Sequence, residues 1–243
     1  MKSPKWSAIR AEARKYLEQR DYSAVPFHQK VQIHGVAANE LLRLAPDDPI
    51  RAELWIPGAE LIPIKSHHQR NRGSFAELGR ETEGALAKIG LWPKQWSTAT
   101  MFAGTAKGFH VHPPFVPEKQ TPEAWFKRLY LSKKAADRPY DREQWDVMYF
   151  LNGSIEILLV DERAGLPRRV WRLYIQGYNR PGPDNVALVI PPGVAHALRA
   201  EGREDLFMVY GSTTLFDPEN EGRIASRIEQ PLLPKDWEAY LTP

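Results

Sequence analysis

The sequence predicts a mostly β fold, a barrel or sandwich of short strands with a helical extension before it and a helical insertion within it. Two observations support this prediction. From about Leu54 onward, short runs rich in β-branched and aromatic residues are separated by Gly, Pro and Asn, as in all-β proteins. Hydrophobic residues make up 42% of the 243 residues and are spread along the chain, which is enough for one full core. We therefore expect one barrel domain over residues 61–243, with an extension over residues 1–60 packed on it.

Composition excludes several classes of protein. No apolar run approaches the roughly 18 residues that a bilayer span requires, and the charged start lacks the apolar core of a secretion signal. These features predict a cytoplasmic protein that does not enter a membrane. Cysteine is absent, so any metal site must use nitrogen and oxygen ligands. The net charge of +3 comes from alternating basic and acidic residues, which favours an anionic small molecule over nucleic acid as the partner.

The extension is expected to hold two helices. Ser3 is a typical helix N-cap, and Pro4 suits the first position of a helix. Apolar residues then recur at helical spacing, which predicts a helix over residues 4–20. A second short helix is expected from Val36 to Leu44, because prolines in the next five residues cannot continue it.

The barrel region contains the clearest strand signals. Residues 147–160 predict a hairpin, in which Asn152 and Gly153 supply the positive φ angles of a two-residue type I′ turn. Further strands are expected over residues 169–175, 186–190 and 206–210. A helix is expected over residues 81–89, before Gly90.

The helical insertion spans residues 113–145, and its helix opens at Thr121 and Pro122. Its aromatic residues, which include Trp125 and Phe126, could form a lid over the barrel mouth. Apolar residues at this spacing are more often the buried face of a helix, and we prefer that interpretation.

Three histidines and a carboxylate indicate the chemistry. His110 and His112 are two residues apart, so on a strand they point to the same side, either as a metal-ligand pair or as ordinary polar contents of a barrel. Asp146 lies seven residues before Gly153. His196 closes the segment Pro191-Pro192-Gly193-Val194-Ala195-His196, just after a tight turn.

This pattern resembles the two motifs of the cupins, HxH…E(x)6G and PxGxxH, with Asp146 in the Glu position. The resemblance implies a jelly-roll barrel, also called a double-stranded β-helix, in which His110, His112, Asp146 and His196 converge on a divalent ion. Such a ligand set suits Mn, Fe, Co, Ni or Zn without choosing between them. The sequence departs from the motif in its long insertion and in Asp146, which could instead be a solvated residue at the start of a strand.

Residues 62–237 resemble more narrowly the dTDP-4-dehydrorhamnose 3,5-epimerase group of cupins. The matching segments are Arg72 to Glu77 (RGSFAE), Lys107 to His110 (KGFH), Ile190 to His196 (IPPGVAH) and Phe216 to Ile224. The resemblance implies a nucleotide-linked keto sugar as substrate, His110 as catalytic base, a homodimer, and substrate binding by Arg72, Glu77 and Lys107.

At other positions the sequence departs from this group. Asp146 stands where the group has a Lys that stabilises an enolate, and His112 stands where it has a Gln. Leu215 and Phe216 occupy the region in which the group has the Tyr that acts as the acid. Because the changes at 112 and 146 also supply metal ligands, we expect a metal-dependent isomerase or epimerase acting on a sugar or keto sugar. Glu118 is a candidate second base, although surface solvation is its usual role. An Fe(II)-dependent dioxygenase and a non-catalytic ligand-binding barrel are the alternatives.

Overall fold

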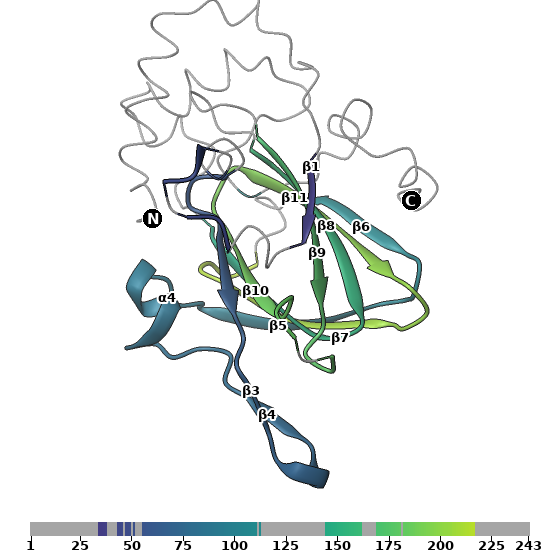
Figure 1. Ribbon diagram of the computed structural model, residues 1–243. Helices are drawn as coiled ribbons and strands as arrows, with labels where there is room; N and C mark the ends of the chain where they lie inside the picture. The colour runs from purple at the N-terminus through teal and green to yellow at the C-terminus, as the bar shows by residue number, and fades with distance from the viewer. Residues whose placement is uncertain are drawn as a thin grey trace, which may run out of the picture.

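The body of the protein is a barrel of two five-stranded sheets packed face to face (Figure 1). The structure is a computed structural model that describes residues 34–37, 43–45, 47–49, 51, 55–110, 112, 144–161, 169–180 and 182–216. Apart from one parallel pair, β1 with β9, the strands in these sheets pair antiparallel. This architecture confirms the mostly β, jelly-roll fold expected from the sequence.

Each sheet draws its strands from distant parts of the chain. Sheet A has the order β1 (His34–Ala37), β9 (Val170–Gln176), β8 (Ser154–Asp161), β11 (Val194–Glu201) and β6 (Ala106–His110). Sheet B has the order β2 (Glu60–Pro63), β10 (Val186–Ile190), β7 (Asp146–Asn152), β12 (Leu206–Ser212) and β5 (Gln95–Met101). Strands β3 (Ser66–His68) and β4 (Ser74–Ala76) form a separate two-stranded hairpin that projects from the barrel (Figure 1).

The core lies between the two sheets because alternate residues of each strand point inward. In β8, for example, Ile155, Ile157 and Leu159 belong to this core. Trp55 packs edge to face on Trp171, with ring centroids 5.1 Å apart. Thus residues 55–59, placed by sequence in the extension, contribute Trp55, Ile56 and Ala59 to the barrel interior.

The hairpin expected over residues 147–160 is wrong, although both of its strands exist. Strand β7 lies in sheet B and β8 in sheet A, so Asn152 and Gly153 form a corner between the sheets. Only Gly153 has a positive φ, of 83°, whereas Asn152 remains in β7 opposite Phe207. Because the Gly177 N–H donates to the Gly153 carbonyl oxygen at 2.7 Å, the corner is stabilised by a neighbouring loop and not by the partner strand of a hairpin.

The expected helix over residues 81–89 is confirmed as α4 (Gly84–Ile89), which ends at Gly90 in the left-handed conformation. Its Leu86 packs on the outer face of sheet B, against Val147 and Tyr149. The helix expected from Val36 to Leu44 is wrong at its start, because Val36 and Ala37 pair with Leu173 and Tyr174 as part of β1. Strand pairing here overrides the helical signal.

Other expectations fall outside the described residues. These are the helix over residues 4–20, the insertion helix, Glu118, and the part of the C-terminal tail after Phe216. In the part of the chain that the structure does describe, no helix is long and apolar enough to cross a membrane.

Candidate metal and substrate site

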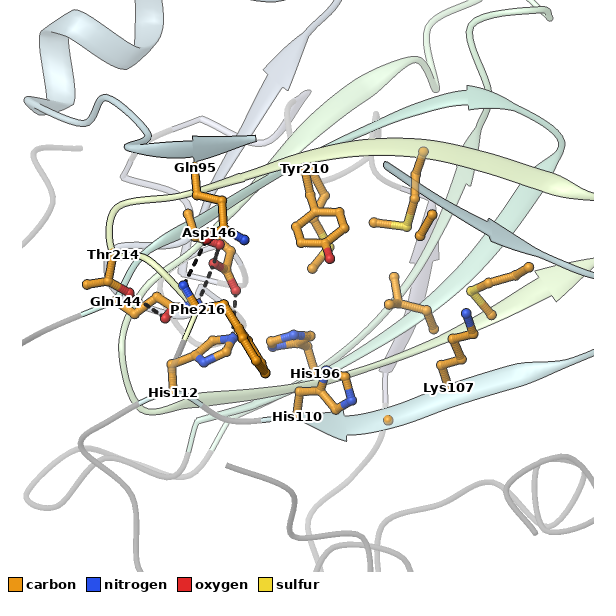
Figure 2. A pocket seen from close by; sticks show the side chains of 17 residues that line it. Gln95, Lys107, His110, His112, Gln144, Asp146, His196, Tyr210, Thr214 and Phe216 are labelled. Atoms are coloured by element: carbon orange, nitrogen blue, oxygen red, sulfur yellow. Dashed lines mark hydrogen bonds and ion pairs between the residues drawn. The ribbon is translucent and has the colours of Figure 1, made fainter. Parts of the chain in front are cut away.

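A cavity of about 560 Å³ lies between the two sheets, with the predicted histidines near its mouth (Figure 2). Met101, Met148 and Met208 line it together with Ala99 and Leu198, which gives it an apolar portion. The remaining lining residues are Gln95, Lys107, Gly108, His110, His112, Gln144, Asp146, His196, Tyr210, Ser212, Thr214 and Phe216. The cavity is therefore lined by both polar and apolar side chains.

Strand register places the polar residues of sheet B in one row. Ser212 in β12 lies opposite Asp146 in β7 on one side and opposite Gln95 in β5 on the other. Because alternate residues share a face, Tyr210 follows Ser212 on the cavity side, and Met208 follows Tyr210. The polar row thus lies at the start of β7 and β5 and at the end of β12.

Sheet A supplies the histidines. His196 in β11 lies opposite His110, the last residue of β6. The register between these strands then shifts, so that Gly108 and Phe109 stand against Ala197 in a β-bulge. His112 follows the end of β6, and its carbonyl oxygen accepts a hydrogen bond of 3.0 Å from the N–H of Gly193.

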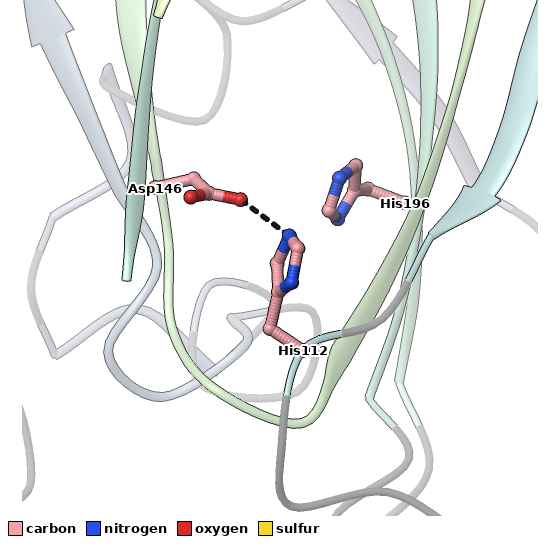
Figure 3. A group of neighbouring side chains, drawn as sticks. All are labelled: His112, Asp146 and His196. Atoms are coloured by element: carbon pink, nitrogen blue, oxygen red, sulfur yellow. Dashed lines mark ion pairs between the residues drawn. The ribbon is translucent and has the colours of Figure 1, made fainter. Parts of the chain in front are cut away.

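His112, Asp146 and His196 form a buried cluster (Figure 3). One ligand atom from each residue lies within 4.8 Å of the other two, and His112 Nε2 is 2.9 Å from Asp146 Oδ2. The fourth predicted ligand, His110, is a neighbour outside this group. Its ring lies 5.9 Å from that of His196, and it lines the same cavity.

Burial and mutual charge determine the protonation of the cluster. Burial and the neighbouring His112 lower the pKa of His196 to about 3, so the ring is neutral at physiological pH. Burial alone would raise the pKa of Asp146. The positive charge of His112 and hydrogen bonds from His112 and Ser212 outweigh it and hold that pKa below its ordinary value. A neutral imidazole and a carboxylate are the forms that bind metals.

The donor set fits a divalent transition metal. Two imidazoles and one carboxylate suit Zn, Fe, Mn, Co or Ni, and three protein ligands leave positions open for a substrate. His196 Nδ1 lies 3.4 Å from the Val194 carbonyl oxygen. A proton on Nδ1 facing that oxygen leaves Nε2 with its lone pair for a ligand, as is usual in metal sites.

The predicted substrate-binding residues lie in two different places. Lys107 lines the cavity, and its ammonium lies 3.4 Å from the Thr100 carbonyl oxygen. Arg72 lies at the exposed tip of the β3–β4 hairpin, where the chain makes a 3-10 turn over Arg70–Arg72. Glu77 follows β4, is exposed, and pairs with Arg80 at 2.7 Å. Neither Arg72 nor Glu77 lines the cavity of its own chain.

Several polar cavity residues escaped the sequence analysis, among them Gln144, Tyr210, Ser212 and Thr214. The available signal was the strand expected over residues 206–210, since its continuation puts Tyr210 and Ser212 on one face. That signal does not say which face points inward, nor that β12 pairs with β7.

The two sheets and the motif histidines define the class of fold: the chain has the RmlC-like cupin fold. A crystal structure of a dTDP-sugar isomerase from Desulfovibrio desulfuricans matches it with a TM-score of 0.51 and 15% identity, over 69% of this chain and 83% of that one. The RmlC epimerase of Mycobacterium tuberculosis matches with a TM-score of 0.50 and 21% identity, over 70% of each chain.

A similarity in sequence also exists. The spore coat polysaccharide biosynthesis protein SpsL of Bacillus subtilis (strain 168) is 28% identical over 153 residues, which are 63% of this chain and 77% of that protein. No family model matches the sequence.

Proposed function

We propose that this chain is an enzyme that epimerises or isomerises a nucleotide-linked keto sugar, and that a divalent metal ion held by His112, Asp146 and His196 assists the reaction. The observation that carries the proposal is the cluster itself, three convergent ligand atoms beside a cavity in a fold shared with dTDP-sugar epimerases and isomerases. The relative SpsL, by name a polysaccharide biosynthesis protein, supports a sugar as the substrate.

Asp146 is the reason to propose a metal. In the epimerase group that the sequence resembles, this position holds a Lys that stabilises the enolate, and a carboxylate cannot do so. Bound by the three ligands, a divalent ion would supply positive charge next to the sugar's carbonyl oxygen. His196 is neutral and Asp146 is ionised, as such binding needs, and His112 would release its proton when the ion binds.

His110 is the proposed base and Tyr210 the proposed acid. His110 extends from β6 in sheet A and Tyr210 from β12 in sheet B, so they enter the cavity from opposite walls (Figure 2). His110 takes the proton from the carbon next to the carbonyl, and the C–H electron pair moves to form the enolate. The phenol of Tyr210 then returns a proton to that carbon on the other face, which inverts its configuration. Tyr210 thereby replaces the Tyr that is missing near Leu215 and Phe216.

The test combines metal analysis with isotope exchange. Protein purified without chelator should contain about one Mn, Fe, Co, Ni or Zn per chain, and His112→Ala should lose it. With dTDP-linked 4-keto sugars in D₂O, the wild type should exchange the hydrogen next to the carbonyl. His110→Asn and Tyr210→Phe should each slow this exchange by about 100-fold or more. Tyr178→Phe, which alters a tyrosine outside the cavity, is the matched control.

Three results would contradict the proposal. If the protein bound no metal even after reconstitution, the proposed metal dependence would be wrong, and the chain would be a metal-free barrel. Metal with no exchange, but with oxygen consumption, would establish the alternative Fe(II) dioxygenase, and metal with neither activity would favour a barrel that only binds ligands.

We also propose that the protein is a homodimer. The β3–β4 hairpin, which projects from the barrel in Figure 1, carries Arg72 at its tip. Phe75 on the same hairpin is 54% exposed. If Arg72 binds substrate as the resemblance implies, the substrate must lie in the cavity of a second copy.

A further inference from the structure

The two oxygens of Asp146 have different surroundings. Oδ1 accepts a hydrogen bond of 2.8 Å from the hydroxyl of Ser212 and one of 3.1 Å from the amide of Gln144. Oδ2 faces the cluster, 2.9 Å from His112 Nε2. Because the side chain is buried and two donors point at Oδ1, rotation of the carboxylate would break both hydrogen bonds.

Both donors are themselves held in place. Ser212 lies directly opposite Asp146 on the paired strand, so backbone register fixes its position. The amide of Gln144 is oriented by Thr214, whose hydroxyl donates to Gln144 Oε1 at 2.6 Å, which turns the NH₂ group toward Asp146.

The backbone joins the same two segments just beyond the strand ends. The N–H of Trp145 donates to Thr213 Oγ1 at 2.9 Å, and the N–H of Thr213 donates to the Trp145 carbonyl oxygen at 3.0 Å. Both donors therefore lie next to a pair of hydrogen bonds that joins the start of β7 to the end of β12, and Figure 2 shows Gln144 between Thr214 and Asp146.

We propose that Ser212 and Gln144 are positioning residues that reserve Oδ2 of Asp146 for the metal, so that Asp146 binds through one oxygen only. This inference rests on the proposed metal site and adds which residues determine its geometry. Without the two donors, the carboxylate is free to rotate, and it either chelates through both oxygens or turns out of the cluster. Loss of such an outer hydrogen bond typically weakens metal binding by about 10- to 100-fold.

The test measures metal binding directly, by titrating chelator-treated protein with Co(II) and recording its visible spectrum. Ser212→Ala and Gln144→Leu should each weaken Co(II) binding by about 10- to 100-fold and change the intensity of the visible bands, since the number of bound oxygens changes. Thr214→Val, which removes only the group that orients Gln144, should have a smaller effect. Ser212→Thr keeps the hydroxyl and should restore wild-type binding.

Ser154→Ala is the matched control, because that hydroxyl donates to Gln176 at 2.9 Å and does not line the cavity. The urea midpoint of metal-free Ser212→Ala should lie below that of Ser154→Ala, because its hydroxyl donates to a buried carboxylate. Co(II) binding is therefore compared under conditions in which urea unfolding shows every variant to be fully folded. Co(II) binding and spectra of Ser212→Ala and Gln144→Leu equal to those of the control would overturn the positioning role alone. A wild type that binds no metal would overturn both this role and the proposed metal.

Discussion

His196 is 2% exposed, and its imidazole lies beside those of His110 and His112. Burial keeps it neutral in the folded protein to about pH 3, whereas in the unfolded chain it takes up a proton near pH 6.5. Between these values the unfolded state binds more protons, so that acid favours unfolding. Asp146 acts in the same direction at lower pH, because its depressed pKa gives stability that is lost as pH falls below about 4.

We therefore predict that the metal-free protein loses stability steadily as the pH falls from about 6.5 toward 3. His196→Gln should flatten the dependence in the upper part of this range, because the glutamine cannot take up a proton. Urea midpoints measured in chelator at pH 7, 6, 5 and 4 provide the check, with His67→Gln on the exposed hairpin as control. Equal pH dependence in His196→Gln and the wild type would show that His196 is not buried as described.

At the scale of single residues, the sequence motifs pointed to some of the residues in the site and missed others. The resemblance to the cupin motifs pointed to His112, Asp146 and His196, and the structure brings these three side chains together. The motifs did not identify Ser212 or Gln144. Their roles depend on the register of β12 against β7, and long-range register is not encoded by spacing within one segment.

A β-bulge at Gly108 in strand β6 determines where His110 lies. Gly108 has a φ of +137°, and a Cβ placed on it would lie 2.6 Å from Ala197 Cβ and 2.9 Å from the His196 carbonyl oxygen. The bulge thus requires glycine at position 108 for two reasons, the positive φ angle and the close approach of β11. It also shifts the register so that His110 stands opposite His196.

Gly108→Ala should therefore destabilise the protein by about 3 kcal/mol and displace His110 from the cavity. Gly104→Ala is an informative control, because Gly104 has a φ of +74° but no atom within 4 Å of the added Cβ. It should cost only about 1 kcal/mol, the strain of the backbone angle. Chemical unfolding of both variants measures the difference, and equal losses would mean that packing against Ala197 contributes nothing.

Among the elements, the strands themselves were predictable and their pairing was not. Residues 186–190 form β10 as expected, since a short apolar run is a local signal. The Asn152-Gly153 pair predicted a hairpin, yet β7 and β8 continue into different sheets. A local turn signal identifies where the chain bends, and packing of the whole barrel decides which strand each neighbour joins.

For the whole molecule, the question is how one site is assembled from parts that are far apart. Lys107 lines the cavity, whereas Arg72 lies on a projecting hairpin (Figure 1). Both are expected to hold the phosphates of the substrate, and phosphate binding by two cations requires that they meet. The proposed dimer brings the hairpin of one copy to the cavity of the other. Light scattering should then give about twice the chain mass of 27.8 kDa.

Mixing two defective variants tests this arrangement. Arg72→Ala and Lys107→Ala should each weaken dTDP binding by about tenfold, while Arg203→Ala, an exposed control, should not. In a mixed dimer, the cavity of the Arg72→Ala copy receives an intact hairpin from its partner and keeps its own Lys107. After subunit exchange of equal amounts, about a quarter of all sites should therefore regain wild-type affinity in calorimetry. If Arg72 acted on its own cavity, every site would keep one defect and mixing would restore none, which would leave the hairpin outside the substrate site.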